Sequence, residues 1–400
     1  MMSKMMKPVL AVGTVGKDEH IKIDSMGKLP EPFRRHLRKT VPLSRVSELY
    51  GAEWTPNKAF DILLSRSVIP LHYSYGGRAP HVAYGVSLLG GKAALVTSFG
   101  DDYDEPYPGF YGGGYFSHLA RSGVVMSPLE ISLPFDKWNY ESAPGYLREN
   151  YKDLSKSSIV VVKGKKTSTI TCVKDQYGID FYYLDDINGA ATIERWRPIP
   201  TDVVRESGIV FVTSSEREFM QQAVDQANKL GKTVVVDIAS YGVTPEYLRH
   251  ITPRSNVLLG NEAEIQQVLD AYEIKSIGDV FEVQGELPMH VVVEDKFNGI
   301  VDIYGRNGRS KRRIGPVRLR KTGNSIGVCD AIGVGIVASL QKGLSLDDGA
   351  AAGLIEGASV WEVEGVQEGL LRREDFVRRL EGEFSAADAE LVERIRKGFS

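Results

Sequence analysis

The sequence has 400 residues but only two cysteines, Cys172 and Cys329. Two thiols so far apart form neither a disulfide framework nor a zinc site, and they suit a reducing, cytoplasmic compartment. Long apolar runs are also missing, because Val9–Val15 is short and interrupted by glycine and Ala331–Leu340 stops at Gln341. A membrane-spanning helix needs about 18 apolar residues. We therefore expect no membrane partner and no signal peptide.

A strong excess of charge of one sign is absent too. The chain carries 49 Lys and Arg against 52 Asp and Glu, a net charge of -3. Proteins that bind nucleic acid are normally basic, so we expect no nucleic-acid partner. The hydrophobic share of 42% and the charged share of 25% are typical of a globular protein and exclude a disordered or low-complexity chain.

Three common catalytic signatures are missing. The stretch Gly85–Lys92 has one residue too many before Gly91-Lys92 for a Walker A loop, and Ala93 replaces the Ser or Thr. Its helix–turn–strand setting also differs from the strand–loop–helix setting of a phosphate loop. No G-x-G-x-x-G follows an expected strand, and no H-E-x-x-H occurs. The familiar nucleotide and zinc motifs therefore do not explain this chain.

Short apolar runs alternate with helical stretches along the chain. The expected strands are Val9–Gly13, Ala94–Ser98, Ile159–Lys163, Ile209–Thr213, Thr233–Ile238 and His290–Glu294, and the expected helices are Ala79–Leu89, Tyr115–Ser122, Arg217–Leu230 and Glu262–Tyr272. Continuous apolar strands are covered on both faces. The pattern predicts an α/β fold, with a doubly wound, mostly parallel sheet flanked by helices. The tail from Asp330 to Phe399 reads as several further helices.

Two stretches interrupt this alternation and predict a small β-rich lid. Residues 22–70 and 128–156 are rich in charge and proline and have no clear period, and a hairpin of Thr167–Val173 and Ile179–Leu184 follows. We therefore expect an α/β domain made of residues 1–21 and 71–400. The lid would be the insert 22–70, with a further contribution near 128–185.

Two glycine-containing segments are candidates for chemistry. Gly76-Gly77 opens one expected helix, and the segment Asn324–Asp330 leads into another. A loop that delivers backbone N–H groups at a helix start is an anion site by physics alone. Asp330 at that start could take a proton from a hydroxyl, although on this segment alone a plain helix cap is the favoured explanation.

Taken together and in order, six segments resemble the ribokinase-like (PfkB) carbohydrate kinase family. They are Val12-Gly13 followed by Asp18, Gly76-Gly77-x-x-x-His81-x-Ala83, Leu89-Gly90 followed by Gly100-Asp101-Asp102, Leu119 followed by Gly123-Val124, Asn261-x-x-Glu264, and Gly327-Val328-Cys329-Asp330. The last four positions stand where the family has G-A-G-D. The resemblance runs from about Val9 to Ala358 and implies a ribokinase-like fold.

The resemblance also implies roles for individual residues. Asp330 would be the general base, and the backbone N–H groups of Gly327, Val328 and Cys329 would form the anion hole. Asn261 and Glu264 would organise Mg²⁺ and the phosphates, mostly through water. The acceptor would be bound by Asp18, Gly76, Gly77, Arg78 and His81, and the nucleotide by Asn261, Glu264, Lys296, Gly299 and Gly327.

The implied activity is that of a small-molecule kinase with ATP and Mg²⁺ as cofactors. It would transfer the γ-phosphoryl group of ATP to a hydroxyl of a sugar or polyol. Two alternatives stay open, a nucleoside kinase of the same family and a non-catalytic, ligand-sensing homologue. The resemblance also leaves open a homodimer formed through the lid.

Four positions depart from the family pattern. His81 replaces an Asn and can charge near neutral pH, and Cys329 replaces a Gly that allows close approach. Lys296 stands where relatives have Gly on the nucleotide side. Asn324 replaces an Asp of the family's potassium-site loop, so we expect weak potassium activation in assays with and without that ion.

Two basic clusters are ambiguous. Eight Lys and Arg lie within Gly305–Lys321 with no acid among them, and Arg34, Arg35, His36, Arg38 and Lys39 lie in the expected lid insert. The first could attract a nucleotide and the second an anionic acceptor. A solvated hairpin is the favoured interpretation of the first cluster, and a solvated face explains the second at least as well.

Overall fold

The computed structural model describes most of the chain. The described residues are 6–25, 27, 61, 62, 65, 67, 68, 72–106, 113–133, 143–175, 181–185, 190–238, 243–283, 290–305, 308–320, 325–384 and 388–400. Most of the expected insert 22–70, Asn324, and the cluster Arg34–Lys39 lie outside them. No helix in the described ranges is long and apolar enough to cross a bilayer.

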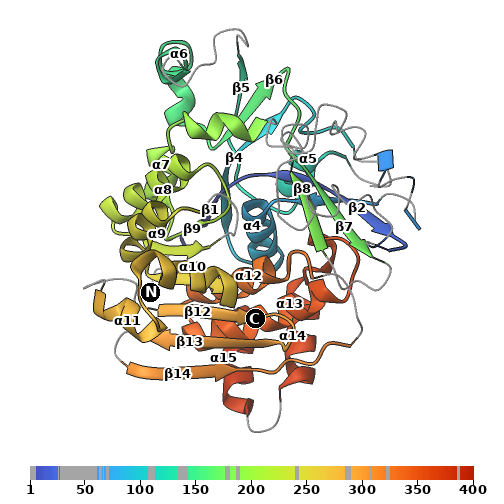
Figure 1. The fold of residues 1–400 in the computed structure, drawn as a ribbon, viewed down its shortest axis with the longest axis vertical. Helices are drawn as coiled ribbons and strands as arrows, with labels where there is room; N and C mark the ends of the chain where they lie inside the picture. The colour runs from blue at the N-terminus through green and yellow to red at the C-terminus, as the bar shows by residue number, and fades with distance from the viewer. Residues whose placement is uncertain are drawn as a thin grey trace.

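A ten-stranded sheet forms the centre of the molecule (Figure 1). In spatial order its strands are β14 (Gly308–Ile314), β13 (Ile300–Gly305), β12 (His290–Asp295), β11 (Val257–Asn261), β10 (Thr233–Asp237), β9 (Ile209–Val212), β1 (Val9–Val12), β4 (Ala93–Gly100), β6 (Ile159–Lys163) and β5 (Pro128–Ser132). The strands from β5 to β12 pair in parallel, and only β13 and β14 are antiparallel. The prediction of a mostly parallel α/β sheet is confirmed.

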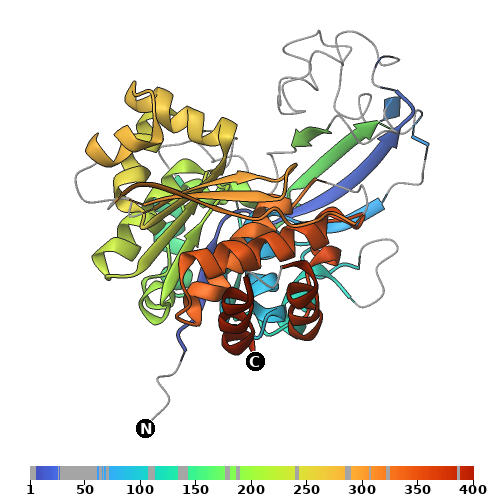
Figure 2. The same cartoon turned by 90° about the horizontal axis from the view of Figure 1, so that it is seen from below.

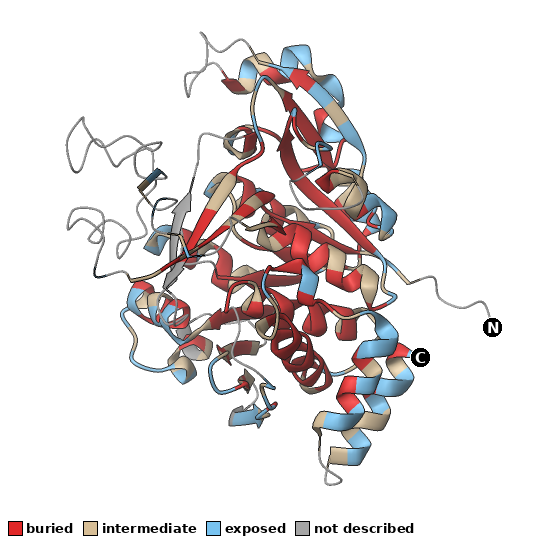
Figure 3. Ribbon diagram, turned by 90° about the vertical axis from the view of Figure 1, so that its right-hand side faces the viewer, coloured by how far each residue is buried: buried red, intermediate tan, exposed pale blue. Residues whose placement is uncertain are grey.

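Helices cover both faces of this sheet, which explains its continuous apolar strands (Figure 3). In β1, Val9 and Ala11 pack into one core, while Leu10 and Val12 pack into the other. The first core is completed by α4 (Arg78–Leu88), α12 (Val328–Gln341) and α13 (Leu346–Trp361), and the second by α8 (Arg217–Lys229), α9 (Pro245–Ile251) and α10 (Glu262–Tyr272). Both cores therefore meet at β1.

Smaller elements complete the main body. The other α-helices are α5 (Tyr115–Arg121), α6 (Ala143–Asn150), α7 (Thr201–Glu206), α11 (Ile277–Val283), α14 (Arg373–Glu383) and α15 (Ala389–Phe399), and the 3-10 helices are η4 (Lys152–Ser155), η5 (Ala190–Arg195), η6 (Thr252–Arg254) and η7 (Gln367–Gly369). Phe376 of α14 packs on Phe399 of α15 with ring centroids 4.9 Å apart. The prediction of several helices after Asp330 is confirmed.

A separate four-stranded sheet projects from the main body (Figure 2). Its strand order is β3 (His72–Gly76), β2 (Gly16–Ile23), β7 (Thr169–Asp175) and β8 (Phe181–Asp185). The expected hairpin is present as β7 and β8, which pair antiparallel. The small sheet also takes in β2 and β3, which lie largely outside the expected insert, whereas β5 joins the edge of the large sheet. We refer to the small sheet as the lid sheet.

The described part of the basic segment includes β14, which forms one edge of the large sheet. In it, β14 pairs antiparallel with β13. Lys311 and Arg313 both contact Asp302, at 2.7 and 2.8 Å, and Arg312 contacts Asp347 at 2.9 Å. The charges of these three residues are therefore matched by acids from other parts of the chain.

A buried arginine links β4 to the segment just before β6 in the large sheet. Arg197 is fully buried, and its guanidinium donates to the carbonyl oxygens of Thr97 at 2.6 Å and Ser157 at 3.0 Å. Burial lowers its pKa to about 10, against the attraction of Glu194. Glu194 also accepts from the hydroxyl of Thr14, which follows β1, at 3.2 Å. This network holds the loop after the central strand.

Helices α12 and α13 approach closely because glycines face each other. A Cβ atom added at Gly335 of α12 would lie 2.1 Å from the backbone nitrogen of Gly353 in α13. A Cβ at Gly353 would in turn lie 2.5 Å from the carbonyl oxygen of Ile332. Only glycine allows backbones to pack this tightly. The contact fixes α12, whose first turn lies at the candidate site.

Replacing Gly335 by Ala should destabilise the protein. The new methyl group meets backbone rather than a flexible side chain, so we expect a loss of about 2 kcal/mol or more in unfolding free energy, as overpacked cores show. Urea unfolding followed by circular dichroism measures this loss. Gly382→Ala is the control, because a Cβ at that α14 position meets nothing within 4 Å. Equal stability of the two variants would show that α12 and α13 can separate without cost.

Candidate functional site

The candidate site lies at the carboxyl end of the parallel strands. Asp237 and Asn261 end β10 and β11, and Glu294 lies near the end of β12. Two helices begin at the same place, α4 with Arg78 and α12 with Val328. Ligands of open α/β sheets bind at this edge, where strand ends and helix starts meet.

The guanidinium of Arg78 is the centre of this site. Its Nη1 lies 3.0 Å from Oδ2 of Asp237. Its Nε lies 3.5 Å from Oδ1 of Asp330, and its Nη2 lies 3.7 Å from Oε1 of Glu264. One arginine thus contacts three carboxylates that come from β10, α10 and α12.

The carboxylates compete for this single positive charge. Burial raises the pKa of Asp330, while Arg78 lowers it and Glu264 raises it. The pKa of Asp237 is also raised by burial, with Arg78 opposing the shift. Burial, with the nearby Asp237, raises the pKa of Glu294 well above its usual range. The acids lift the pKa of Arg78 well above its ordinary value although burial opposes this, so Arg78 stays charged.

Several carboxylate oxygens of the site are left for a ligand. Oδ1 of Asp237 and Oε2 of Glu294 are buried and accept no hydrogen bond from the described residues. In the described ranges, no three His, Cys, Asp or Glu side chains gather closely enough to hold a metal ion directly. Mg²⁺ retains several waters and often uses only one or two carboxylates. The donors therefore fit a Mg²⁺ ion held largely through water.

The start of α12 has the geometry expected of an anion hole. Gly327 caps the helix with a φ of 79°, a conformation that favours glycine. The first N–H groups of a helix have no acceptor within it, and here they belong to Gly327, Val328, Cys329 and Asp330. Burial, with the nearby Glu294 carboxylate, raises the pKa of the Cys329 thiol well above its usual value. The thiol is therefore turned toward the end of β12.

The pair Asn261 and Glu264 has a structural task that the sequence analysis did not assign. Oδ1 of Asn261 accepts from the Glu264 N–H at 3.1 Å, and Oε2 of Glu264 accepts from the Asn261 N–H at 2.9 Å. This reciprocal pair is a capping box at the start of α10. Only Oε1 of Glu264 is directed at Arg78. The local cap alone explains the spacing of the motif.

The glycine pair lets the lid sheet approach α4. A Cβ at Gly76 would lie 2.0 Å from Oδ1 of Asp18 in β2, so only glycine fits there. Gly77 has a φ of 85°, and a Cβ on it would lie 2.5 Å from the carbonyl oxygen of Thr14. Asp18 therefore lies directly against the turn that leads into Arg78, and it is only 4% exposed.

His81 lies behind the site rather than on its surface. Its side chain has no exposed area, and its Cε1 atom would be 3.3 Å from a Cβ added at Gly327. Burial lowers its pKa to about 3, so the imidazole is neutral. The expectation that His81 can charge near neutral pH is therefore wrong. Its predicted contact with the acceptor would require the loop at Gly327 to move.

Two of the predicted nucleotide residues, Lys296 and Gly299, line a narrow apolar cavity. Lys296, Gly299 and Val328 surround it together with residues of α12 and α13, including Leu354. Its volume is only about 10 Å³, whereas small-molecule pockets hold roughly 300–1,000 Å³. The structure thus brings these residues together but leaves no room for a base. A nucleotide would have to separate the turn at Lys296 from the two helices.

The sequence analysis did not assign two residues of this site, Asp237 and Glu294. Both follow buried apolar strands, in Thr233–Asp237 and His290–Asp295. Acidic residues at the carboxyl ends of parallel strands meet at one edge of the sheet. That rule could have found them, because both strands were predicted.

Comparison with known proteins gives a fold but no sequence match. No family model matches the sequence, and no curated protein matches it. The Methanocaldococcus jannaschii nucleoside kinase, described as an archaeal member of the ribokinase family, superposes with a TM-score of 0.64 at 19% identity. The superposition covers 94% of this chain and 99% of that one.

Two further structures agree with this result. The Burkholderia thailandensis nucleoside kinase in complex with inosine has a TM-score of 0.64 at 15% identity, covering 94% of this chain and 98% of that one. The Arabidopsis thaliana ribokinase complexed with ribose and ATP has a TM-score of 0.61 at 14% identity, covering 95% and 100%. The chain therefore has the ribokinase-like α/β fold, as predicted.

Removing the charge of Arg78 should destabilise the protein in a pH-dependent way. We expect Arg78→Met to lose about 3–5 kcal/mol, the usual effect of removing one partner of a buried ion pair. Without the guanidinium the folded-state pKa values of Asp237 and Asp330 rise further. Carboxyls with raised folded-state pKa values favour the folded state less as pH rises above about 4. The loss in Arg78→Met should therefore be larger at pH 8 than at pH 5.

Thermal unfolding at both pH values measures this difference. Arg78→Lys should recover part of the stability, because it restores charge without the planar fork. Arg378→Met is the matched control, since Arg378 forms an exposed pair with Asp375. A loss in Arg78→Met that is equal at the two pH values would show that packing, not charge, dominates at this position.

Proposed function

We propose that this chain is an ATP-dependent small-molecule kinase that phosphorylates a hydroxyl of a sugar, polyol or nucleoside. One observation carries the proposal. Asp330 lies at the start of α12, beside free backbone N–H groups. It contacts Arg78, the residue that follows the Gly76-Gly77 pair in the sequence. In this proposal a carboxylate, an anion site and an acceptor edge at Asp18 meet at one place, which is what phosphoryl transfer requires.

Solved structures of similar fold support this proposal through their own ligands. They include a nucleoside kinase in complex with inosine and a ribokinase complexed with ribose and ATP. A ribokinase from Cryptococcus neoformans was solved in complex with ADP. Neighbours of this fold therefore bind hydroxyl-bearing small molecules and adenine nucleotides.

In the proposed reaction, Asp330 acts as the general base. Its carboxylate takes the proton of the acceptor hydroxyl, and the oxygen attacks the γ-phosphorus of ATP. The bond from the γ-phosphorus to the bridging oxygen breaks, and ADP leaves with the electron pair. The N–H groups of Val328 and Cys329 face the negative charge that spreads over the phosphoryl oxygens. Positioning and charge stabilisation supply most of the acceleration.

Arg78 has a role at two stages in this proposal. In the structure it contacts Asp330, and its charge opposes the rise in the Asp330 pKa that burial causes. Arg78 thereby favours the ionised form of the base. A guanidinium also forms strong hydrogen bonds to phosphate oxygens, so Arg78 would turn to the transferring group when the nucleotide binds.

Mg²⁺ would be held by the carboxylates around Arg78. Asp237, Glu264 and Glu294 offer oxygen donors, mostly through water. When bound, the ion would neutralise phosphate charge. The lid sheet, which carries Asp18, would exclude water that could otherwise accept the phosphoryl group.

We also propose a reducing, cytoplasmic compartment, since Cys172 and Cys329 are both free thiols. A homodimer formed through the lid sheet is also part of the proposal.

The acceptor class is decided by assay. ADP release should be measured with ribose, myo-inositol and inosine, each at saturating ATP and Mg²⁺. Turnover with ribose or inositol supports a sugar or polyol kinase, and turnover with inosine alone supports the nucleoside alternative. Binding without turnover for every acceptor would support the ligand-sensing alternative, in which the contact between Arg78 and Asp330 persists.

Replacing Asp330 by Asn should abolish most turnover. We expect kcat to fall by about 10²–10⁴-fold, the usual contribution of a positioned general base, while acceptor affinity changes little. Steady-state ADP release and acceptor titration calorimetry measure the two quantities. Asp295→Asn is the control, because that carboxylate only caps the turn at Asn298. Turnover of Asp330→Asn within a few-fold of wild type would remove Asp330 from the base role.

A further inference from the structure

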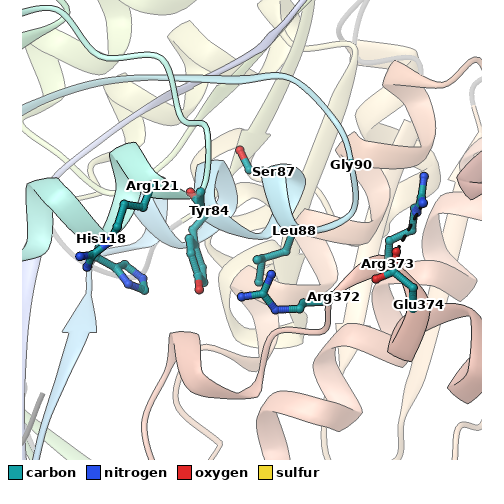
Figure 4. A pocket seen from close by; sticks show the side chains of 10 residues that line it. Tyr84, Ser87, Leu88, Gly90, His118, Arg121, Arg372, Arg373 and Glu374 are labelled. Atoms are coloured by element: carbon teal, nitrogen blue, oxygen red, sulfur yellow. Dashed lines mark hydrogen bonds and ion pairs between the residues drawn. The ribbon is translucent and has the colours of Figure 1, made fainter. Parts of the chain in front are cut away.

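A second cavity lies away from the candidate active site, at the other end of α4. It occupies about 540 Å³ between α4, α5 and the start of α14, and Figure 4 shows its lining. The lining includes Tyr84, Ser87, His118, Arg121, Arg372 and Arg373. A volume in the range of 300–1,000 Å³ is typical of small-molecule sites.

Positive charge dominates this cavity. Arg121 and Arg372 form no hydrogen bond or ion pair with any other described residue, and Arg373 contacts only its neighbour Glu374, at 3.4 Å. Burial lowers the pKa of His118 to about 4, so this histidine is neutral. Three arginines against one carboxylate leave an excess positive charge that no group in the described part of the cavity neutralises.

Another wall of the cavity is aromatic. Tyr84 packs on His118 with ring centroids 4.4 Å apart, and Tyr75 stacks on the other side at 4.3 Å. In Figure 4, Tyr84 lies between His118 and Arg372. An aromatic wall beside guanidinium groups suits a compact organic anion better than a free metal ion or an apolar ligand, since arginine pairs with phosphate through directed hydrogen bonds.

We propose that this cavity is a regulatory site for a small phosphate-bearing anion. Arg121 and Arg372 would bind the phosphate oxygens, and Tyr84 would pack against the rest of the ligand. The site does not overlap the proposed active site, because Ser87 lies nine residues after Arg78 on the same helix. At about 1.5 Å of rise per residue, that separation is roughly 14 Å.

A chain of contacts links the cavity to the glycine pair. Nε2 of His118 lies 3.1 Å from Oε1 of Gln367, so His118 is the donor. Nε2 of Gln367 donates to the hydroxyl of Tyr115 at 2.7 Å. That hydroxyl donates to the carbonyl oxygen of Gly76 at 2.5 Å. A ligand that orders His118 would therefore also order the turn that positions Arg78.

Binding is tested first, with inorganic pyrophosphate as the probe. Isothermal titration calorimetry of the full chain in Mg²⁺-free buffer should show binding, and Arg372→Gln and Arg121→Gln should each weaken it by about tenfold or more. Arg378→Gln on the same helix α14 is the matched control, because Arg378 is paired with Asp375 outside the cavity. Wild-type affinity in both cavity variants, or no wild-type binding tighter than about 1 mM, overturns the proposal.

The link to the glycine pair is tested by hydrogen exchange. Pyrophosphate should slow backbone exchange in peptides that cover residues 76–79, and Tyr115→Phe should abolish that slowing while it leaves pyrophosphate affinity unchanged. Tyr115→Phe keeps the ring and removes only the hydroxyl. Unchanged exchange in the bound wild-type protein, or equal slowing in Tyr115→Phe, overturns the regulatory role. Neither measurement depends on turnover, so the outcome is independent of whether the chain is a kinase.

Discussion

The contact of Arg78 with three buried carboxylates is the interaction on which the candidate site depends. A buried carboxylate without a partner is strongly unfavourable, and Asp237, Glu264 and Asp330 come from three separate elements. One guanidinium therefore fixes the ends of β10, α10 and α12 relative to α4. Because its charge also opposes the rise in the pKa of Asp330, the same group determines both the shape of the site and the protonation of its base.

Backbone geometry places Arg78 where this contact is possible. Gly77 adopts a positive φ, and Gly76 leaves room for the side chain of Asp18, so the lid sheet lies close to the first turn of α4. The close approach at Gly335 and Gly353 fixes α12 from the opposite side. The charged cluster therefore lies between two places where glycine lets neighbouring segments approach more closely than any other residue would allow.

Local pattern predicted much of this fold and part of the site. A continuous apolar run predicted β6 with the bounds that the structure shows. The order of the motifs identified Gly76, Gly77 and Asp330 as candidate site residues. Strand β2 was not predicted because its sequence, GKDEHIKI, is rich in charged residues and has no continuous apolar run. The strand-end rule could have placed Asp237 and Glu294 at the carboxyl edge of the sheet. The contact of Asp237 with Arg78 arises from the packing of distant segments, which a local pattern does not encode. Burial of His81 likewise depends on α12, whose first turn covers it from about 250 residues further along the chain.

The central position of β1 has a consequence for how the chain is made. Val9 pairs with Ala93 of β4 on one side and with Ile209 of β9 on the other, so β1 is synthesised before both of its partners, which follow about 80 and 200 residues later. Contacts of such long sequence separation form slowly. Arg78 emerges before all three of its carboxylates, and Asp330 comes last. During synthesis the growing chain therefore exposes an apolar strand and an unneutralised arginine, a state in which chaperone binding protects against aggregation.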